Sequence, residues 1–482
     1  MYKAYVTYVT NIRPAANADR LNACEVFGNT TIIDKTITED TLVLYLPSDG
    51  QISVEFGEKN NLFRRKDDAG NNVGGFIDPD KRNITAIRLR GNRSDGLVLP
   101  ISALNYCYAH GDASIELRAG DVIDGLVNGH EICCKYIPRS NTRRGTVTEG
   151  NRTRKKKVAT APLFKEHADT EQLAYNLGAF KVGDEIEITL KMHGTSQRTG
   201  YLPVLKGYKR TFVDWLLRRQ GRPIYDWGYV SGTRRVVLEN YEGGFYGNNE
   251  FREQHSKVFE GKLWKGETVY YEVVGFTTSG APIMASASNS KLNDKEFIKQ
   301  YGKETVFSYG CTPDGKKTMY GRDDNGEFTI NCTWPQSDIY VYRMTMTNPD
   351  GEVVEYTPDF MRYRCEQMAV KTVPVFFKGV IPANEDIIYV DKNENDQCDE
   401  GEVTYVKPTD PGKWVMNKAE QYYDGPDPVG KTHVREGVVV RIINRPKFAA
   451  YKHKNFSFKV LEGIAKVDAE APDMEEAQEV TE

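Results

Sequence analysis

The sequence predicts an α+β protein in which a region of short β-strands precedes a larger domain of antiparallel sheets flanked by helices. Residues 1 to about 135 contain short apolar runs separated by turn residues, such as TLVLYLPSDGQIS, with almost no helical periodicity. From about residue 160 to 465, strand-like runs such as ETVYYEVVGF, REGVVVRIIN and FSFKVLEG alternate with helical stretches such as TPDFMRYRCEQMAV. The 482 residues, 39% of them hydrophobic, are enough for about two to four domains with apolar cores.

The N-terminal region, residues 1–138, is predicted to be a small β-barrel or sandwich, because several short strands in a region of this size favour such folds. The stretch from NADRLNACEVFGN to LVLYLPSDGQIS resembles the OB domains of some RNA ligases and of tRNA-binding modules. This resemblance implies an OB-type β-barrel that binds nucleic acid.

Two basic segments follow. Residues 139–158 include RSNTRRGTVTEGNRTRKKK, with eight Lys or Arg residues and one acidic residue, and are predicted to be a basic linker. This linker is either a solubilising tether or a contact to nucleic-acid phosphates. The segment from Arg210 to Pro223 combines Trp215 with several arginines, as in an RNA-facing helix or in a surface helix whose aromatic side chain is anchored in the core.

The larger domain is placed at residues 159–466. Within it, residues 378–430 are acidic, contain Pro and Gly and are weakly periodic, which indicates an insertion. The DKNENDQCDEG segment in this insertion lacks the Gly and Glu positions of a calcium-binding loop. Residues 467–482 are predicted to be a disordered acidic tail.

Composition argues against several classes of protein. The eight cysteines form no C-x-x-C pair and the seven histidines no H-E-x-x-H motif, so neither a zinc site nor a disulfide framework is indicated. The net charge of −4 argues against a uniformly basic nucleic-acid coat. No run is long and apolar enough to span a membrane, and the N-terminus lacks a signal pattern. We therefore expect a cytoplasmic protein with no membrane partner, and no protein partner is implied.

The stretch EIEITLKMHGTSQRTG, residues 185–200, ends a predicted strand with a lysine and a turn of small residues. Apolar and polar residues alternate along this strand, so Lys191 points away from the core. His193 and Gly194 follow in a turn that lets the backbone approach a ligand closely and that offers two hydroxyl groups. Lys191 is thus either a phosphate-facing residue or a solvated lysine before a glycine turn.

Later stretches place charged residues where isolated strands would not need them. These residues are Arg234, or alternatively Arg235, in SGTRRVVL; Glu272 in VYYEVVGF; Glu436 in VREGVVVRI; and Lys452 and Lys454 in YKHKNFSFKV. A carboxylate inside an apolar strand needs a cation or a hydrogen-bond donor. Two lysines on one face of a strand need an anion, unless they guard an exposed edge.

Taken in order, Lys191-x-His-Gly, Ser-Gly-Thr-Arg, a strand glutamate, Glu-Gly and Lys-x-Lys resemble the covalent nucleotidyltransferase superfamily of ligases and capping enzymes. KMHGTS is more specifically similar to the ATP-dependent RNA ligases with an N-terminal OB domain, since DNA ligases and capping enzymes usually carry Asp where His193 stands. FKEHADTEQL and YVYRMTMTNPDGEVVEY also look like that group. The similarity extends from about residue 1 to 465, and the inserts near 205–225 and 378–430 depart from it.

The resemblance implies an enzyme that joins 3′-OH and 5′-phosphate RNA ends, as in the sealing of nicks during RNA repair, through a lysine–AMP intermediate and an adenylated 5′ end. It implies these roles: Lys191 as nucleophile; Lys452 and Lys454 on the α-phosphate; Glu436 and Glu272 on Mg²⁺ or Mn²⁺ or its waters; and His193, Gly194 and Arg234 in the ATP site. Tyr340 or Tyr342 either stacks on adenine or belongs to the core.

Three other functions are compatible with the same residues. A DNA ligase or a guanylyltransferase would use the same chemistry, although His193 in place of Asp argues against both. A non-catalytic RNA- or tRNA-binding protein with an OB domain would carry a degenerate nucleotide site. That alternative predicts the loss of the nucleophile or of the paired lysines, all of which are present.

Overall fold

The computed structural model describes residues 2–18, 20–66, 73–89, 91–136, 160–168, 170–217, 219–238, 241, 249–284, 288–303, 320–322, 328–330, 336–389, 404–430 and 433–467. These residues form two compact units. The first contains the described residues of Met1–Arg139 and Phe456–Ala469, and the second those of Ser140–Asn455. The predicted linker at 139–158 and the predicted tail beyond residue 467 lie outside the described residues. In the described part of the chain, no helix is long and apolar enough to cross a membrane.

The first unit is built from short antiparallel strands. Its largest sheet has the order β10-β5-β1-β11, formed by Leu97–Pro100, Val43–Leu46, Ala4–Thr7 and Val122–Ile123. Two three-stranded sheets have the orders β2-β3-β4 (Thr10–Pro14, Leu21–Val26, Asn29–Asp34) and β14-β6-β7 (Cys133–Lys135, Gly50–Ile52, Asn83–Ile84). The unit also contains the pairs β8–β9 (Ile87–Leu89, Asn92–Ser94) and β12–β13 (Leu126–Val127, His130–Glu131), and helix α1 (Val54–Lys59).

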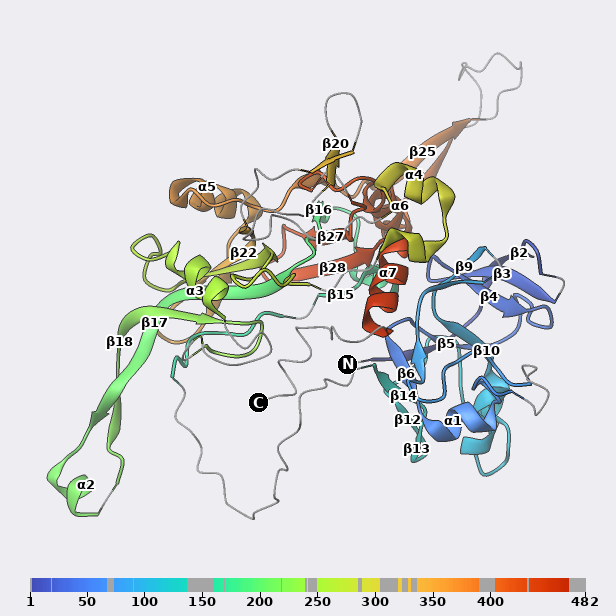
Figure 1. The fold of residues 1–482 in the computed structure, drawn as a ribbon, viewed down its shortest axis with the longest axis horizontal. Helices are drawn as coiled ribbons and strands as arrows, with labels where there is room; N and C mark the ends of the chain where they lie inside the picture. Colours follow the sequence, from blue (N-terminus) through green and yellow to red (C-terminus); the bar gives the residue numbers. More distant parts are fainter. Residues whose placement is uncertain are drawn as a thin grey trace. The chain divides into compact units, whose positions relative to one another are not determined.

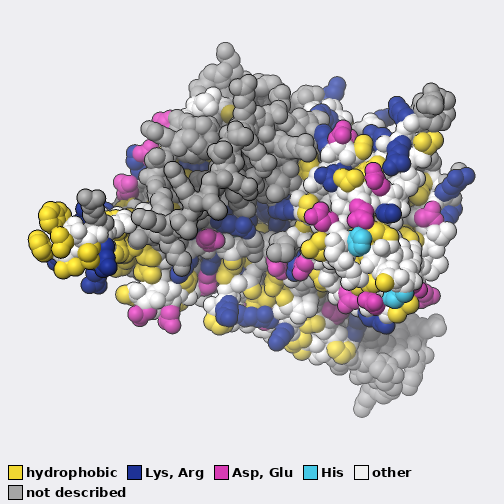
Figure 2. Space-filling model, turned by 90° about the horizontal axis from the view of Figure 1, so that it is seen from below, with side chains coloured by type: hydrophobic (Ala, Val, Ile, Leu, Met, Phe, Trp, Pro, Cys, Tyr) yellow, Lys and Arg dark blue, Asp and Glu magenta, His cyan; other side chains and the backbone are white. Residues whose placement is uncertain are grey.

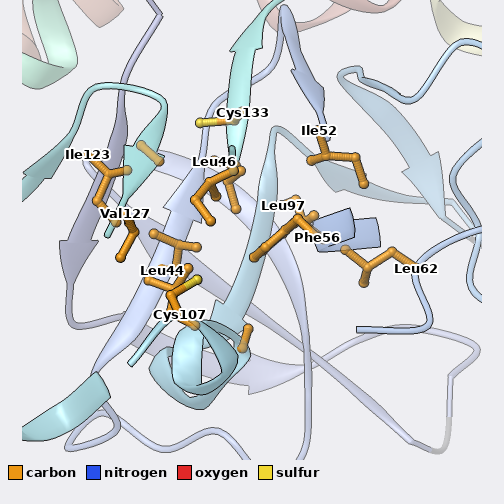
Figure 3. Close-up of a cluster of buried hydrophobic side chains, with 14 of the residues drawn as sticks. Leu44, Leu46, Ile52, Phe56, Leu62, Leu97, Cys107, Ile123, Val127 and Cys133 are labelled. Atoms are coloured by element: carbon orange, nitrogen blue, oxygen red, sulfur yellow. The ribbon is translucent and has the colours of Figure 1, made fainter. Parts of the chain in front are cut away.

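Side chains from several of these elements meet in one apolar core (Figure 3). Leu44 and Leu46 of β5, Ile52 of β6 and Phe56 of α1 are fully buried there. Helix α1 begins after Ser53, whose hydroxyl accepts a hydrogen bond from the Phe56 amide at 3.0 Å. Within the described residues these sheets do not join into one closed barrel, so the OB-type barrel stays a prediction.

Helix α7 (Phe456–Val467) belongs to the first unit, although it follows the last strand of the second. The Lys459 ammonium lies 2.5 Å from the Asp95 carboxylate, and the Arg93 guanidinium lies 5.2 Å from the centre of the Phe456 ring. The sequence predicted a strand of the larger domain at FSFKVLEG, and this prediction is wrong, because a short apolar run does not distinguish a strand from a helix or show which core covers it.

The second unit contains two five-stranded sheets (Figure 1). The lysine sheet has the order β15-β28-β27-β16-β24, formed by Glu171–Gln172, Ala449–Lys454, Gly437–Ile442, Glu185–Leu190 and Val375–Val380. The arm sheet has the order β18-β17-β19-β22-β23, formed by Arg222–Gly232, Thr195–Lys209, Glu267–Gly275, Ser337–Thr347 and Val353–Glu355. The strand pairs of both sheets are antiparallel apart from β15 with β28. The antiparallel α+β architecture expected from the sequence is confirmed.

Helices cover one face of the arm sheet. Phe251 of α3 (Glu250–Lys257) and Met361 of α5 (Pro358–Met368) join a buried cluster with Tyr271 and Val341 of the sheet. Helix α6 (Pro411–Tyr423), inside the predicted insertion, packs on β27 and β28. The remaining helices and hairpins are α2 (Phe212–Leu216), α4 (Lys295–Tyr301), β20–β21 (Tyr320–Arg322, Phe328–Ile330) and β25–β26 (Asn384–Tyr389, Thr404–Pro408). Short 3₁₀ helices are η1 (Ile101–Cys107), η2 (Ala113–Ile115), η3 (Leu173–Tyr175), η4 (Leu177–Ala179) and η5 (Asn289–Leu292).

Candidate active site

Lys191 and Glu436 meet where the strands of the lysine sheet end. Lys191 directly follows β16, and Glu436 directly precedes β27, the strand that pairs with β16. The Lys191 amide donates to the Gly437 carbonyl at 3.0 Å, and its ammonium lies 2.6 Å from Oε1 of Glu436. Lys454 ends β28, on the other side of β27, and its ammonium lies 3.5 Å from the same oxygen. Antiparallel pairing therefore brings these three charged residues together at one end of the sheet's inner strands.

Glu436 is the buried centre of this group. Its side chain is only 3% exposed, whereas that of Lys191 is 24% exposed. Burial alone would raise the pKa of Glu436, but the charges of Lys191 and Lys454 outweigh burial and hold this pKa below its usual value. Glu436 is therefore an ionised carboxylate at neutral pH.

The second oxygen of Glu436 points toward His193. Nδ1 of His193 lies 3.7 Å from Oε2, which is longer than a hydrogen bond. Oε2 is buried and has no hydrogen-bond partner among the described residues. A buried, negatively charged oxygen of this kind is suited to bind a divalent cation. The other ligands of that cation would be waters and substrate phosphates. Glu436 is thus the residue of this site that could hold Mg²⁺ or Mn²⁺.

Metal binding by protein groups alone is not indicated. In the portion of the chain that the structure describes, no group of three or more His, Cys, Asp or Glu side chains is arranged to hold a metal ion.

Two glycines allow the backbones of the site to approach one another. A Cβ atom on Gly194 would lie 2.4 Å from the Val273 carbonyl oxygen and 2.8 Å from Cγ of Glu272. The turn after Lys191 therefore rests directly against β19, next to Glu272, as the sequence grouped them. Gly437 has a φ of +145°, and its Cβ would lie 2.1 Å from the His453 carbonyl oxygen. Only glycine lets β27 and β28 come this close beside Glu436.

The arm sheet supplies the residues opposite Glu272. Ser196 and Tyr340 are its partners in register on the two neighbouring strands, and the Ser196 hydroxyl lies 2.7 Å from that of Tyr342. Tyr340 is buried in an apolar cluster, and burial raises its pKa above the usual value. Of the two tyrosines considered for adenine stacking, Tyr340 is thus a core residue.

Lys452 belongs to the same strand as Lys454. Lys452 lies opposite Val439, two residues before Lys454 and on the same face of β28.

Arg234 and Arg235 lie beside the segment that precedes the lysine sheet. The Arg234 side chain is half-buried, and its backbone carbonyl accepts from the His167 amide at 3.1 Å. The Arg235 side chain is exposed, and its carbonyl accepts from Arg198 at 3.2 Å.

His167 belongs to a buried cationic cluster that the sequence reasoning did not single out. Arg343 donates to Nδ1 of His167 at 3.0 Å and forms an ion pair with Glu355. Burial, followed by the charges of Arg343, Arg234 and Arg198, lowers the pKa of His167 well below its usual value. His167 is therefore neutral and carries its proton on Nε2. Arginines inside otherwise apolar strands were the available signal, because a buried guanidinium requires specific partners.

The Arg198 side chain forms hydrogen bonds with two segments of the chain, around residues 164–165 and 233–235. Its guanidinium donates to the backbone carbonyls of Phe164, Lys165, Thr233 and Arg235. The side chain is only 1% exposed. Removal of Arg198 would therefore release both the segment that contains His167 and the turn that contains Arg234.

The solved structures that share this fold include several of an RNA ligase. The chain is similar to Naegleria gruberi RNA ligase with PPi, at 15% identity over 94% of this chain and 97% of that chain, with a TM-score of 0.51. It is also similar to a lysine-to-methionine mutant of that ligase with AMP and Mn, at 14% identity over 95% and 97% of the two chains, with a TM-score of 0.50. An aspartate-to-alanine mutant without ligand matches at 15% identity over 95% and 96%, with a TM-score of 0.50.

At these identities the likeness establishes the fold. No protein-family model matches this sequence, and no curated protein is significantly similar to it.

Proposed function

We propose that the chain is an ATP-dependent RNA ligase that joins 3′-OH and 5′-phosphate ends through a lysine–AMP intermediate. The observation that carries this proposal is the group formed by Lys191, Glu436 and Lys454, in which a partly exposed lysine lies 2.6 Å from a buried, ionised carboxylate. The fold that places this group is shared with an RNA ligase, which adds support.

In the first step, Nζ of Lys191 attacks the α-phosphorus of ATP, an N–P bond forms, and pyrophosphate leaves with the electrons of the broken P–O bond. A free lysine has a pKa of about 10.4, so attack requires loss of the ammonium proton to solvent or to a nearby base. A divalent cation at Glu436 would stabilise the α-phosphate and compete with the Lys191 ammonium for the same carboxylate.

The remaining residues bind the nucleotide. Lys452 and Lys454, on one face of β28, supply positive charge for the α-phosphate as negative charge develops. Glu272 accepts from the ribose hydroxyls or supports the metal, and Arg234 orients the ribose or a phosphate. His193 contributes to the same site by its position beside Glu436.

In the later steps, AMP passes from Lys191 to the 5′-phosphate of RNA, and the 3′-hydroxyl attacks that adenylate and releases AMP. The first unit and the basic linker would bind the RNA strand through phosphate contacts and stacking. We give His193 no weight in choosing RNA over DNA. Mutants of the Naegleria gruberi RNA ligase alter a lysine and an aspartate two positions later, so aspartate at that spacing is compatible with an RNA ligase.

The decisive experiment is the intact mass of the protein before and after incubation with ATP and Mg²⁺ or Mn²⁺, with GTP in parallel. We expect a gain of one AMP that is reversed by pyrophosphate and absent in Lys191→Ala. Lys413→Ala, a change at an exposed lysine of α6, is the matched control and should adenylate normally. No gain with either nucleotide would favour the non-catalytic RNA-binding alternative.

The substrate is tested next with nicked duplexes. Their 3′-hydroxyl strand is RNA in one set and DNA in the other, and each carries a 5′-phosphate at the nick. Sealing of the RNA set alone is expected. Equal sealing of both sets would indicate a general polynucleotide ligase.

A further inference from the structure

Strands β17 and β18 extend beyond the arm sheet as a two-stranded arm (Figure 1). Strand β17 pairs with β19 only over Thr195–Gly200, whereas it pairs with β18 as far as Lys209 opposite Arg222. The nine residues beyond Gly200 correspond to about 30 Å of extended chain at roughly 3.3 Å per residue. Helix α2 closes the end of this arm.

The arm tip, defined as residues 210–217 and 219, carries an exposed apolar cluster. Its large hydrophobic side chains are Phe212, Val213, Trp215, Leu216 and Leu217, which are between 52% and 75% exposed. Figure 2 shows hydrophobic side chains gathered at the end of the arm, with basic side chains next to them. Trp215 is 65% exposed, so the alternative in which its ring is anchored in the core is wrong.

The tip has a defined structure. The Thr211 and Asp214 side chains form a reciprocal capping box at the start of α2. Hydrogen bonds from Thr211 lower the pKa of Asp214, which keeps it ionised. At about 100° per residue, the five apolar residues cover an arc of roughly 200° that excludes Asp214. The tip is therefore a fixed turn of helix with a broad apolar surface.

Basic residues surround this surface. The basic collar consists of the exposed residues Lys206, Lys209, Arg210, Arg219 and Arg222. Lys209 and Arg222 lie directly opposite each other across the two strands, a pairing of like charges that is unfavourable without an anion. An occupant of the tip must therefore combine negative charge with an apolar layer.

We propose that the arm tip docks on the surface of an anionic phospholipid membrane. Such a membrane presents phosphates above an acyl layer, and an interfacial helix buries its apolar face by roughly 5–10 Å. Helix α2 would occupy that apolar layer while the basic collar, within a few residues of it, meets the phosphates. The absence of a spanning run led us to expect no membrane partner, but docking by a tip needs no spanning helix.

Two other occupants fit the tip less well. A second copy of the chain, bound tip to tip, would bring two basic collars together. RNA would satisfy the basic collar and could stack on Phe212 or Trp215, but Val213, Leu216 and Leu217 have no flat ring for a base to stack on.

The test uses the full chain and sedimentation with vesicles of phosphatidylcholine, either alone or with about 30% phosphatidylserine, at about 0.1 M salt. We expect the protein to bind the mixed vesicles. Its binding to vesicles of phosphatidylcholine alone should be at least about tenfold weaker. Leu216→Ser/Leu217→Ser should weaken binding at least tenfold. Val353→Ser/Val354→Ser, which changes two adjacent exposed valines of β23, is the matched control and should bind normally.

Two further variants separate insertion from loss of folding. Trp215→Phe should keep binding but remove most of the blue shift of tryptophan fluorescence that vesicles cause. Arg210→Gln/Arg219→Gln should lose the preference for phosphatidylserine. Every variant is also compared with the wild type by circular dichroism and urea unfolding midpoint.

Three results would overturn the proposal. The first is wild-type protein that binds neither kind of vesicle, or a leucine variant that binds as the wild type does. The second is a leucine variant that loses affinity for duplex RNA while vesicle binding is unchanged, which would assign the tip to RNA. The third is a wild-type dimer that becomes a monomer in the leucine variant, which would assign the tip to contact between copies.

Discussion

Substitution of Gly437 by alanine should separate β27 and β28, the two strands beside Glu436 and Lys454. The new Cβ would lie 2.1 Å from the His453 carbonyl oxygen, whereas real Cβ atoms essentially never come closer than 3.0 Å. The strands must therefore move apart by about 1 Å. Since Glu436 and Lys454 are the neighbours of this contact, the movement should separate the carboxylate from the ammonium.

The magnitude follows from two contributions. A positive φ costs a residue with a Cβ about 1–2 kcal/mol, and overpacking in a close contact adds about 1–3 kcal/mol. Gly437→Ala should therefore lower the free energy of unfolding by about 2–5 kcal/mol. A misplacement of about 1 Å can slow a positioned reaction by about 100-fold. The rate of AMP transfer to the protein, followed by intact mass in a single turnover, should fall by that order.

Gly183→Ala is the matched control for this prediction. Gly183 has a φ of +84°, but no atom lies within 4 Å of the position of its Cβ. This variant should show the backbone contribution alone, about 1–2 kcal/mol in urea unfolding, with an unchanged adenylation rate. Our account of Gly437 is refuted if Gly437→Ala unfolds at the same urea concentration as Gly183→Ala and adenylates at the wild-type rate.

Four further predictions concern the charged groups. Glu436→Gln should slow adenylation at least about 100-fold, measured by intact mass, because it removes the carboxylate that would hold the metal; a rate within threefold of wild type would contradict this role. EDTA should stop adenylation by wild-type protein, and excess Mg²⁺ or Mn²⁺ should restore it; activity in EDTA would exclude a metal requirement. Arg364→Ala should lower the free energy of unfolding by about 3–5 kcal/mol, measured in urea, because it leaves the fully buried Glu267 carboxylate without its ion-pair partner; a small effect would show that Glu267 is compensated otherwise. Burial lowers the pKa of His255 to about 4. As the pH falls, His255 therefore binds a proton at a higher pH in the unfolded chain than in the folded protein. Stability from this residue is complete above about pH 6.5 and falls by up to about 3 kcal/mol as the pH approaches 4; His255→Gln should lack this part of the pH dependence.

The local structure around Lys191 could be predicted from the residue pattern alone. Ile186, Ile188 and Leu190 are buried, as the alternation predicted, because in a strand the side-chain period of two fixes which face each residue occupies. The order of the charged motifs also pointed to Lys191, Glu436 and Lys454, which meet in the structure, and Glu272 interrupts an apolar strand as expected.

Which of these residues touch could be seen only in the folded chain. Lys191 and Glu436 are 245 positions apart in the chain, and the register of β16, β27 and β28 brings them together. The buried pair of Arg343 and His167 escaped prediction for the same reason. Apolar residues in a short segment do not reveal whether a core covers them, so only the fold showed that Trp215 is exposed at the end of an arm. Long-range strand pairing and burial depend on contacts between distant parts of the chain, whereas the alternation of a strand is set by its own backbone.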